Sequence, residues 1–218
     1  MVKKKNILIC FDRDGTIIYD DKYHLGSQKN WKDLIRFRRG IFGSLKMLNK
    51  KLPDAKIYMI SNQSGVAIKD FPLLTEKKSR EVCRYIVNLI KERGVDLEKC
   101  FVCPHTTKAY TKSHPQFTFD KKILCNCKCN KPLPGMVLEA LRDAGWKREN
   151  TSIYIVGDRA SDLQTAHNAR GFGILVPFGN RPGEKKLVGK LKDKERHISK
   201  NFGDAVEFIV HRENGLRA

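Results

Sequence analysis

Two aspartates, Asp12 and Asp14, end the first apolar run of the chain, in the sequence NILICFDRDGTII of residues 6–18. The run has the length and composition of a buried strand, and Gly15 lets the chain turn away directly after it. At the carboxyl edge of a parallel sheet, two such carboxylates can share a divalent cation that offsets their repulsion. Taken alone, the same residues also fit an Asx-type turn that closes an ordinary strand. The pair therefore needs partners elsewhere in the chain before it indicates a reaction.

Small polar and charged residues follow two further apolar runs. The segment SNQSG (61–65) comes after AKIYMI, and GDRASD (157–162) comes after SIYIV. Since the carboxyl ends of parallel strands meet at one edge of a sheet, we expect these segments to lie beside the two aspartates. Phosphoryl transfer needs a nucleophile, a cation that bridges it to the phosphate, and donors around the phosphoryl oxygens. The convergence of these segments predicts a site for that chemistry.

Four residues have side chains that suit the reacting groups of such a site. Asp12 can attack phosphorus, and Asp14 can give a proton to the leaving alcohol and later activate water. Ser61 can donate a hydrogen bond to the phosphoryl oxygens. Lys131 can neutralise the charge that builds up in the transition state. Each of these residues also has an ordinary role, since Ser61 could cap a turn and Lys131 could be a surface lysine.

Two further aspartates suit a metal site. Asp158 can complete an oxygen-rich magnesium site, and Asp162 can orient the metal ligands without binding the ion itself. In order along the chain, FDRDGT, SNQSG, a KP pair before a helix and GDRASD resemble the four motifs of the haloacid dehalogenase superfamily of phosphatases. The resemblance covers residues 6–178. It implies a phosphorylated Asp12 as the intermediate, and Mg²⁺ held by Asp12, the carbonyl group of Asp14 and Asp158.

The cysteines indicate a second metal site. Cys103 and His105 are followed by Cys127 and Cys129, which together offer three sulfurs and one imidazole. This set suits tetrahedral structural zinc, and the metal would explain how the polar insert 103–131 stays ordered without an apolar core. Buried structural cysteines are the alternative. Cys125 is a spare thiol that could take the place of Cys127 or Cys129 as a zinc ligand.

Together with the cysteine segments, the motifs are similar to a subgroup that contains D-glycero-D-manno-heptose 1,7-bisphosphate phosphatase and the histidinol-phosphate phosphatase domain. This resemblance implies a small phosphorylated substrate and assigns to its binding Asn62, Gln63, Ser64, Asn130 and Arg159. The subgroup usually has arginine at the position of Asn130. Asparagine cannot hold a second phosphate by a charged bidentate contact. The sequence therefore supports a phosphomonoester substrate in general more strongly than a bisphosphate.

Two other functions compete with a sugar phosphatase. Polynucleotide 3'-phosphatases also resemble the chain in DxDGT, TNQxG and KPxxGM, although that family generally lacks the cysteine loop. The formal net charge of +19 would suit DNA ends, and a lysine-biased composition with solvated side chains is the alternative explanation for it. The third possibility is a binding module that is held together by zinc and has no catalytic activity. The absence of hydrolysis in an assay with generic phosphomonoesters and Mg²⁺ would favour it.

The elements that would position these residues alternate between strands and helices. Apolar residues at helical spacing predict helices over 40–52, 75–93, 134–143 and about 160–169. Strands are expected at 6–12, 55–60, 99–103, 152–156 and 173–177, and 205–210 is expected to be a last edge element. The segment 105–131 shows no helical period. The alternation predicts an α/β fold, a Rossmann-like parallel sheet flanked by helices, with no large cap and with one domain over 1–218.

The bulk composition fits an ordinary globular enzyme. Hydrophobic residues make up 40% and charged residues 31% of the 218 residues, enough for one well-formed core. No apolar run approaches the roughly 20 residues that span a bilayer, and residues 1–5 lead directly into the first strand. We therefore expect a cytoplasmic monomer that acts on a small substrate without a membrane partner, with nucleic acid as the less favoured partner.

Overall fold

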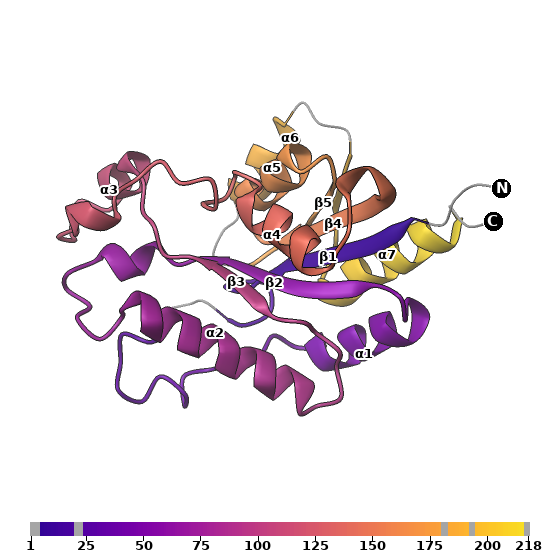
Figure 1. Cartoon of the computed structure of the whole chain (residues 1–218), viewed down its shortest axis with the longest axis horizontal. Coiled ribbons are helices and arrows are strands. Elements are labelled where there is room, and N and C mark those ends of the chain that lie inside the picture. Colours follow the sequence, from indigo (N-terminus) through magenta and orange to yellow (C-terminus); the bar gives the residue numbers. More distant parts are fainter. Residues whose placement is uncertain (1–4, 20–23, 180–182, 192–194, 216–218) are drawn as a thin grey trace.

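A single parallel sheet forms the centre of the protein in the computed structural model, which describes residues 5–19, 24–179, 183–191 and 195–215 (Figure 1). The strand order is β3-β2-β1-β4-β5-β6, and each neighbouring pair is parallel. The strands are β1 (Asn6–Asp12), β2 (Lys56–Asn62), β3 (Cys100–Cys103), β4 (Thr151–Gly157), β5 (Phe172–Leu175) and β6 (Arg196–Ile198). The predicted α/β class with a Rossmann-like sheet is confirmed.

Helices cover both faces of the sheet (Figure 1). One face is covered by α1 (Ile41–Lys51), α2 (Glu76–Lys91) and α7 (Phe202–Gly215), and the other by α4 (Gly135–Asp143), α5 (Ala160–Asn168) and α6 (Gly183–Gly189). In β1, Ile9 and Phe11 point to the first face, whereas Leu8 and Cys10 point to the second. A strand covered on both sides is apolar at every position, which explains the continuous apolar run at the start of the chain.

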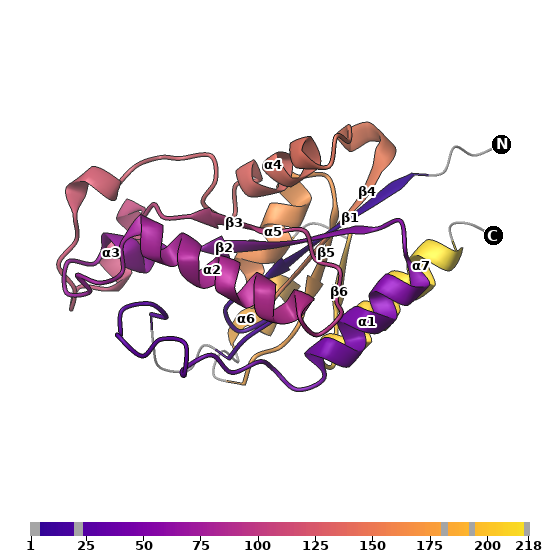
Figure 2. The same ribbon diagram turned by 60° about the horizontal axis from the view of Figure 1, so that its bottom comes forward.

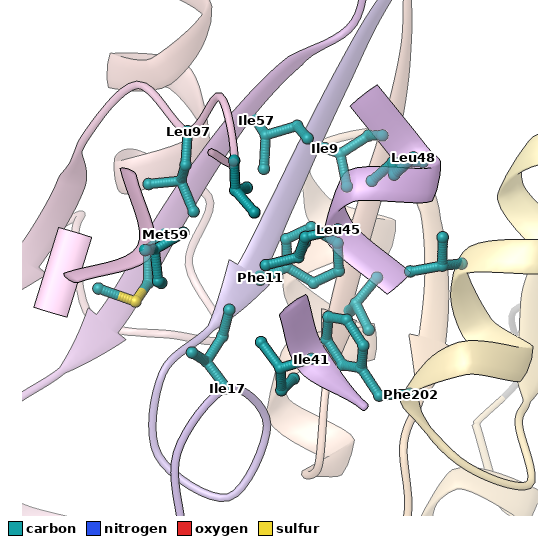
Figure 3. Packing of buried hydrophobic residues seen from close by; sticks show 14 of the residues in the cluster. Ile9, Phe11, Ile17, Ile41, Leu45, Leu48, Ile57, Met59, Leu97 and Phe202 are labelled. Atoms are coloured by element: carbon teal, nitrogen blue, oxygen red, sulfur yellow. The ribbon is translucent and has the colours of Figure 1, made fainter. Parts of the chain in front are cut away.

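The larger core lies between the sheet and the helices α1, α2 and α7. Phe11 packs against Leu45 and Ile41 of α1, and its ring centroid lies 5.1 Å from that of Phe202 at the start of α7 (Figure 3). Helices α1 and α7 lie side by side in both ribbon views (Figures 1 and 2). This packing fixes the end of β1, where Asp12 begins the polar segment.

The order of the strands creates a switch point between β1 and β4. The chain moves outward from β1 through β2 to β3, then returns to the other side of β1 to form β4. The loops that follow β1 and β4 therefore leave in different directions, and in open α/β sheets ligands bind in the crevice at this point. Asp12 and Asp158 lie there.

The insert 103–131 follows β3 and lies at the opposite end of the molecule from the start of β1 (Figure 1). It contains one short helix, α3 (Lys108–Ser113), and a 3₁₀ turn at Lys121–Ile123; two further 3₁₀ turns lie outside it, at Ser64–Ala67 and Arg148–Asn150. Isolated β-bridges join Thr106 to Leu124 and Ile68 to Phe119. The insert thus consists mainly of loop.

Two expectations about the elements were wrong, and one strand was missed. Residues 205–210 belong to helix α7 rather than to an edge element, because Ala205, Val206, Ile209 and Val210 are buried on one helical face. The insert does contain a helix, α3, which Thr107 caps by accepting a hydrogen bond from the N–H of Tyr110. Strand β6 was not anticipated.

The polar sequence of residues 19–33 predicts a loop, and the basic sequence of residues 180–201 predicts a loop followed by a peripheral helix; residues 20–23, 180–182 and 192–194 of these segments lie outside the described residues. Among the residues that are described, no helix combines the length and the apolar composition that a membrane span requires.

Candidate active site

Four buried charged side chains meet where β1 and β4 end. Asp12 is the last residue of β1, Asp158 directly follows β4, and Asp162 lies in the first turn of α5. One carboxylate oxygen of each lies within 4.8 Å of the others. The Nζ atom of Lys131 lies 2.5 Å from Oδ1 of Asp12 and 2.6 Å from Oδ1 of Asp162. Residues from three separate parts of the chain therefore form one cluster.

Asp162 reaches this cluster because Gly157, the last residue of β4, has no side chain and leaves room for the Asp162 carboxylate. A Cβ atom on Gly157 would lie 2.2 Å from the Cγ atom of Asp162, so only glycine allows this close approach. Oδ2 of Asp162 accepts a hydrogen bond of 3.0 Å from the backbone N–H of Arg159, just before α5 begins. A carboxylate in the first turn of a helix is also favoured by the helix dipole. Its orientation toward Lys131 is thus fixed by the backbone.

The charges of the cluster fit a divalent cation. Burial raises the pKa of the Asp12 carboxyl group to about 6, and Lys131 opposes part of this rise. Burial also opposes the charge of Lys131, but the carboxylates of Asp12 and Asp162 outweigh it and raise the pKa of the ammonium group. Lys131 therefore stays charged and neutralises one of the three carboxylates. The two remaining negative charges and the oxygen ligands suit Mg²⁺.

The carboxylate of Asp14 is held apart from this cluster by two neighbours. Nε and Nη2 of Arg13 donate to it at 2.8 and 2.7 Å, and Nε2 of Gln63 donates at 2.8 Å. Arg13 is itself buried, and its Nη1 donates to the Sγ atom of Cys83 at 3.2 Å. Burial raises the pKa of Asp14, but the charge and hydrogen bonds of Arg13 lower it overall. If Asp14 binds the metal, its backbone carbonyl is the group for it, as the family resemblance implies.

Ser61 lies buried near the end of β2, beside the same amide group. Its Oγ atom accepts a hydrogen bond of 2.8 Å from Nε2 of Gln63, which leaves the hydroxyl proton to be donated. Gln63 thus connects Ser61 to Asp14.

Asn62 and Asn130 position the lysine and connect it to the insert. Oδ1 of Asn62 accepts from the backbone N–H of Lys131 at 3.0 Å, and its Nδ2 donates to the carbonyl of Lys131 at 3.1 Å. Nδ2 of Asn130 and Oγ of Ser64 both donate to the carbonyl oxygen of His105, at 3.1 and 3.2 Å. The backbone that carries Lys131 is therefore tied to a residue of the cysteine cluster.

That cluster has the dimensions of a metal site. Sγ of Cys103 lies 3.6 Å from Sγ of Cys127, 3.2 Å from Sγ of Cys129 and 3.7 Å from Nδ1 of His105. Four tetrahedral ligands at usual zinc distances stand about 3.8 Å apart for two sulfurs and about 3.6 Å apart for sulfur and nitrogen. The predicted set of four residues is thus brought together and can hold a metal ion, and Cys125 is not among the grouped ligands.

An open pocket of about 820 Å³ is lined by two members of the carboxylate cluster, Asp12 and Lys131. Its lining includes residues from the ends of β1 and β2 and residues of α3 in the insert. The lining residues that sequence reasoning anticipated are Asp12, Asp14, Asn62, Gln63, Ser64, Asn130, Lys131 and Arg159. Ser61, Asp158 and Asp162 are buried and do not line it.

Sequence reasoning missed two groups of residues. Arg13 lies inside the recognised motif FDRDGT, but its position in the sequence does not show that its guanidinium group donates hydrogen bonds to the carboxylate of Asp14. Thr107, Tyr110, Ser113 and His114 line the pocket from the insert. Their only signal was the high content of hydroxyl and aromatic residues in a segment without helical period.

At the switch point of the sheet, the site combines buried carboxylates, a lysine and a place for a divalent cation, which are the groups that phosphoryl transfer requires. Residues 7–203 match the family model described as Polynucleotide kinase 3 phosphatase, and the chain belongs to this family.

Curated relatives extend the match. D-glycero-beta-D-manno-heptose-1,7-bisphosphate 7-phosphatase of Photorhabdus laumondii is 30% identical over 172 residues, covering 78% of this chain and 80% of that protein. The Escherichia coli K12 protein of the same name is 33% identical over 172 residues, covering 78% and 79%. The histidine biosynthesis bifunctional protein HisB of Buchnera aphidicola is 28% identical over 219 residues, and the match spans 53% of it.

A solved structure shows the same fold. D,D-heptose 1.7-bisphosphate phosphatase from B. bronchiseptica, complexed with magnesium and phosphate, superposes with a TM-score of 0.70 at 22% identity, covering 94% of this chain and 98% of that one. Together these matches confirm the predicted resemblance to haloacid dehalogenase superfamily phosphatases, and the protein is a phosphatase.

Proposed function

We propose that the protein hydrolyses a phosphomonoester in two steps through a phosphorylated Asp12. In the first step an oxygen of Asp12 bonds to phosphorus while the bond from phosphorus to the alcohol oxygen breaks, and Asp14 gives a proton to the departing alcohol. In the second step a water oxygen bonds to phosphorus, the bond to Asp12 breaks, and Asp14 takes the proton from the water. The lowered pKa of Asp14 suits this second, proton-accepting step, whereas the first step requires the protonated carboxyl group.

The remaining residues of the site bind and stabilise the phosphoryl group. Lys131 bridges Asp12 and Asp162, so its ammonium group lies within reach of phosphoryl oxygens carried on Asp12. Ser61 donates its hydroxyl proton to the same oxygens. We assign Mg²⁺ to Asp12, the carbonyl group of Asp14 and Asp158, and we assign to Asp162 the role of orienting these ligands. When bound, the ion supplies positive charge that screens the nucleophile from the phosphate.

For the cysteine cluster we propose structural zinc, bound by Cys103, His105, Cys127 and Cys129. The interatomic distances support it, since they are close to those of a tetrahedral site before any ion is considered. The hydrogen bonds to the carbonyl of His105 support a role in shaping the pocket. The insert 103–131 is then a loop of one phosphatase domain rather than a unit that folds alone.

The substrate class that we propose is a small sugar phosphate, with D-glycero-D-manno-heptose 1,7-bisphosphate as the first candidate. The observation that carries this choice is the pairing of the cysteine cluster with the catalytic cluster, in a chain about 30% identical to heptose bisphosphate phosphatases over more than three quarters of its length. Asn62, Gln63, Ser64, Asn130 and Arg159 are assigned to substrate binding. All five line the pocket.

Histidinol phosphate is a second candidate because of the HisB relative, and a 3'-phosphorylated polynucleotide is a third because of the description of the matching family. The net charge of +19 also favours a polyanion. We further propose that the enzyme works as a monomer in the cytoplasm, where free thiols such as buried Cys10 and Cys83 stay reduced.

A panel of phosphomonoesters assayed with Mg²⁺ tests the proposal. It compares the heptose bisphosphate, hexose phosphates, histidinol phosphate and an oligonucleotide with a 3'-phosphate. We expect the highest kcat/KM on a sugar phosphate, and we expect that value to change little with salt. A preference for the oligonucleotide that falls steeply with salt would replace the sugar proposal by the polynucleotide one. Absence of hydrolysis on every substrate, including 4-nitrophenyl phosphate, would refute the catalytic assignment.

A further inference from the structure

The turn that follows β1 carries Asp14 and is closed by its own backbone. The N–H groups of Ile17 and Ile18 both donate to the carbonyl of Arg13 at 3.0 Å. The N–H of Gly15 donates to the carbonyl of Ile18 at 2.8 Å. The Gly15 N–H and the Asp14 carbonyl belong to one planar peptide unit and point in opposite directions, so this bond directs the Asp14 carbonyl away from the turn. That carbonyl is one of the proposed ligands of Mg²⁺.

Gly15 is the residue at which the turn has the most conformational freedom. Its φ is 84°, a left-handed conformation that glycine enters readily and that its missing side chain does nothing to fix. The peptide unit on the far side of Gly15 is held from outside the turn, because Nη1 of Arg38 donates to the Gly15 carbonyl at 2.5 Å. The two peptide units that flank the glycine are therefore both held, one by the turn itself and one by Arg38.

The backbone of Arg38 is joined to the same turn. Its N–H donates to the carbonyl of Ile17 at 3.0 Å, and an antiparallel bridge pairs the preceding residue, Phe37, with Ile18. At the other end of the side chain, the guanidinium carbon lies 5.3 Å from the centroid of the Phe178 ring. The start and the end of the Arg38 side chain are thus both restrained.

The second arm of the guanidinium group connects the turn to the loops after β4 and β5. Nη2 of Arg38 donates to the carbonyl of Pro177 at 3.1 Å, two residues after β5 ends. The preceding residue, Val176, donates its N–H to the carbonyl of Gly157 at 2.7 Å. Gly157 ends β4 and directly precedes Asp158. A short series of hydrogen bonds therefore joins Arg38 to the backbone that carries Asp158.

The bridge depends on properties that are specific to arginine. A guanidinium group is planar and always charged, and it holds its donors in fixed directions, so one side chain can bind two carbonyl oxygens at once. Arg38 is half-buried, and burial of its charge is unfavourable unless such hydrogen bonds compensate it. The two carbonyl groups are therefore held firmly, and the spacing of the loops that contain them is restrained.

We propose that Arg38 is a positioning residue of the active site, which fixes the backbone carbonyl of Asp14 relative to Asp158 and thereby shapes the site of Mg²⁺. This inference rests on the proposed function, in which both aspartates supply ligands to the ion. Arg38 is not among the residues that line the pocket, so it acts through the backbone and not on the substrate. It also lies outside the motifs that carry the family resemblance.

Two matched substitutions test the proposal. Arg38→Met removes the charge and the donors but keeps a long side chain, and Arg39→Met makes the same change at the neighbouring, exposed arginine. Isothermal titration calorimetry of the substrate-free protein measures the Kd of Mg²⁺ without any reaction. We expect this Kd to rise about tenfold in Arg38→Met and to keep its wild-type value in Arg39→Met, because residues that orient metal ligands affect affinity on this scale.

Turnover of 4-nitrophenyl phosphate at saturating Mg²⁺ is the second readout. In Arg38→Met kcat should fall about tenfold, whereas KM should change little because the pocket lining is intact. Arg38→Ala leaves space for a free guanidinium ion. Guanidinium chloride, at a concentration far below that which unfolds the protein, should restore part of kcat in this variant, and the same concentration of NaCl should not. Arg38→Lys keeps the charge without the planar group and should give intermediate values of Kd and kcat.

The outcomes separate this inference from the proposed function. Equal Kd values for Mg²⁺ in Arg38→Met and Arg39→Met would overturn the positioning role, even if Arg38→Met unfolds at a lower temperature. Guanidinium that restores no more activity than NaCl would also contradict it. Absence of hydrolysis by the wild type would refute the proposed function, and the Kd values would then decide on Arg38 by themselves. Circular dichroism shows whether each variant keeps its fold.

Discussion

Replacing Lys131 by methionine removes the one positive charge inside the carboxylate cluster while keeping a side chain of similar length. The lysine side chain is 4% exposed, and its partners Asp12 and Asp162 are 9% and 1% exposed. The substitution therefore leaves buried carboxylates without their cation.

The expected loss of stability follows from this burial. Removing one partner of a buried ion pair typically costs about 3–5 kcal/mol, because an uncompensated charge stays behind. For a domain of this size that corresponds to a fall in Tm of roughly 6–20 °C. Lys131 also lowers the pKa of Asp12, so its removal should raise that pKa further. Loss of a charge that stabilises the transition state should reduce kcat by about 100- to 1,000-fold.

Added Mg²⁺ distinguishes the cluster as a cation site from a merely structural ion pair. Without the repulsion from Lys131, the three carboxylates should bind Mg²⁺ more tightly than in the wild type. Binding to the folded state raises its stability by RT ln(1 + [Mg²⁺]/Kd), so a lower Kd in the variant should give a larger rise in Tm at the same Mg²⁺ concentration. Differential scanning fluorimetry with and without Mg²⁺, at fixed ionic strength, measures both shifts.

A matched control is Lys99→Met, since Lys99 forms an exposed ion pair with Asp143. That pair should contribute less than about 1 kcal/mol, and Mg²⁺ should act on this variant as on the wild type. If Lys131→Met were as stable as Lys99→Met, or if Mg²⁺ stabilised it less than it stabilises the wild type, the assignment of the cluster as a magnesium site would be wrong.

Three further substitutions test other parts of the account. Cys127→Ser should lower zinc affinity by at least the roughly 10- to 100-fold that loss of a supporting residue costs, and should raise KM, as metal analysis and kinetics can show. Gly157→Ala should displace Asp162 and reduce kcat at least tenfold, because the added Cβ would lie 2.2 Å from Cγ. Tyr154→Phe should cost about 1–3 kcal/mol in urea unfolding, since buried Glu213 loses a hydrogen bond of 2.7 Å.

Each of the three has an outcome that contradicts it. Full zinc content in Cys127→Ser would point to Cys125 as a replacement ligand. Gly43→Ala is the control for the glycine substitution, because a Cβ there meets open space within α1, and it should be neutral or stabilising by up to about 1 kcal/mol. Equal kcat in both glycine variants would show that Asp162 is not held as described. An unchanged urea midpoint in Tyr154→Phe would show that Glu213 finds another partner.

The sheet and the main cluster could be predicted because their signals are local. Each buried strand is a continuous apolar run, and each ends in polar residues, so topology alone brings Asp12 and Asp158 together. Helix α7 was misread because residues 205–210 were considered as a short apolar run. The longer pattern, with Asn201 accepting from the N–H of Asp204 at the start, has the period of a helix.

The contribution of α3 to the pocket lining and the pairing of Arg13 with Asp14 could not be predicted, for physical reasons. Helix α3 has six residues and no buried side chain, so its position depends on the cysteine cluster and the bridges of the insert rather than on periodicity. The direction of the Arg13 side chain depends on Cys83, a residue 70 positions away in the chain. Such contacts exist only in the folded chain.

The most direct test of the central claim is mass spectrometry of the enzyme quenched in acid during turnover of 4-nitrophenyl phosphate with Mg²⁺. Asp14→Asn is the variant to use, because this leaving group departs without a proton donor while hydrolysis of the intermediate loses its base. We predict one added phosphoryl group on the peptide that contains Asp12, and none in a second variant that also carries Asp12→Asn. A phosphoryl group on another residue, or turnover that survives Asp12→Asn, would contradict the account.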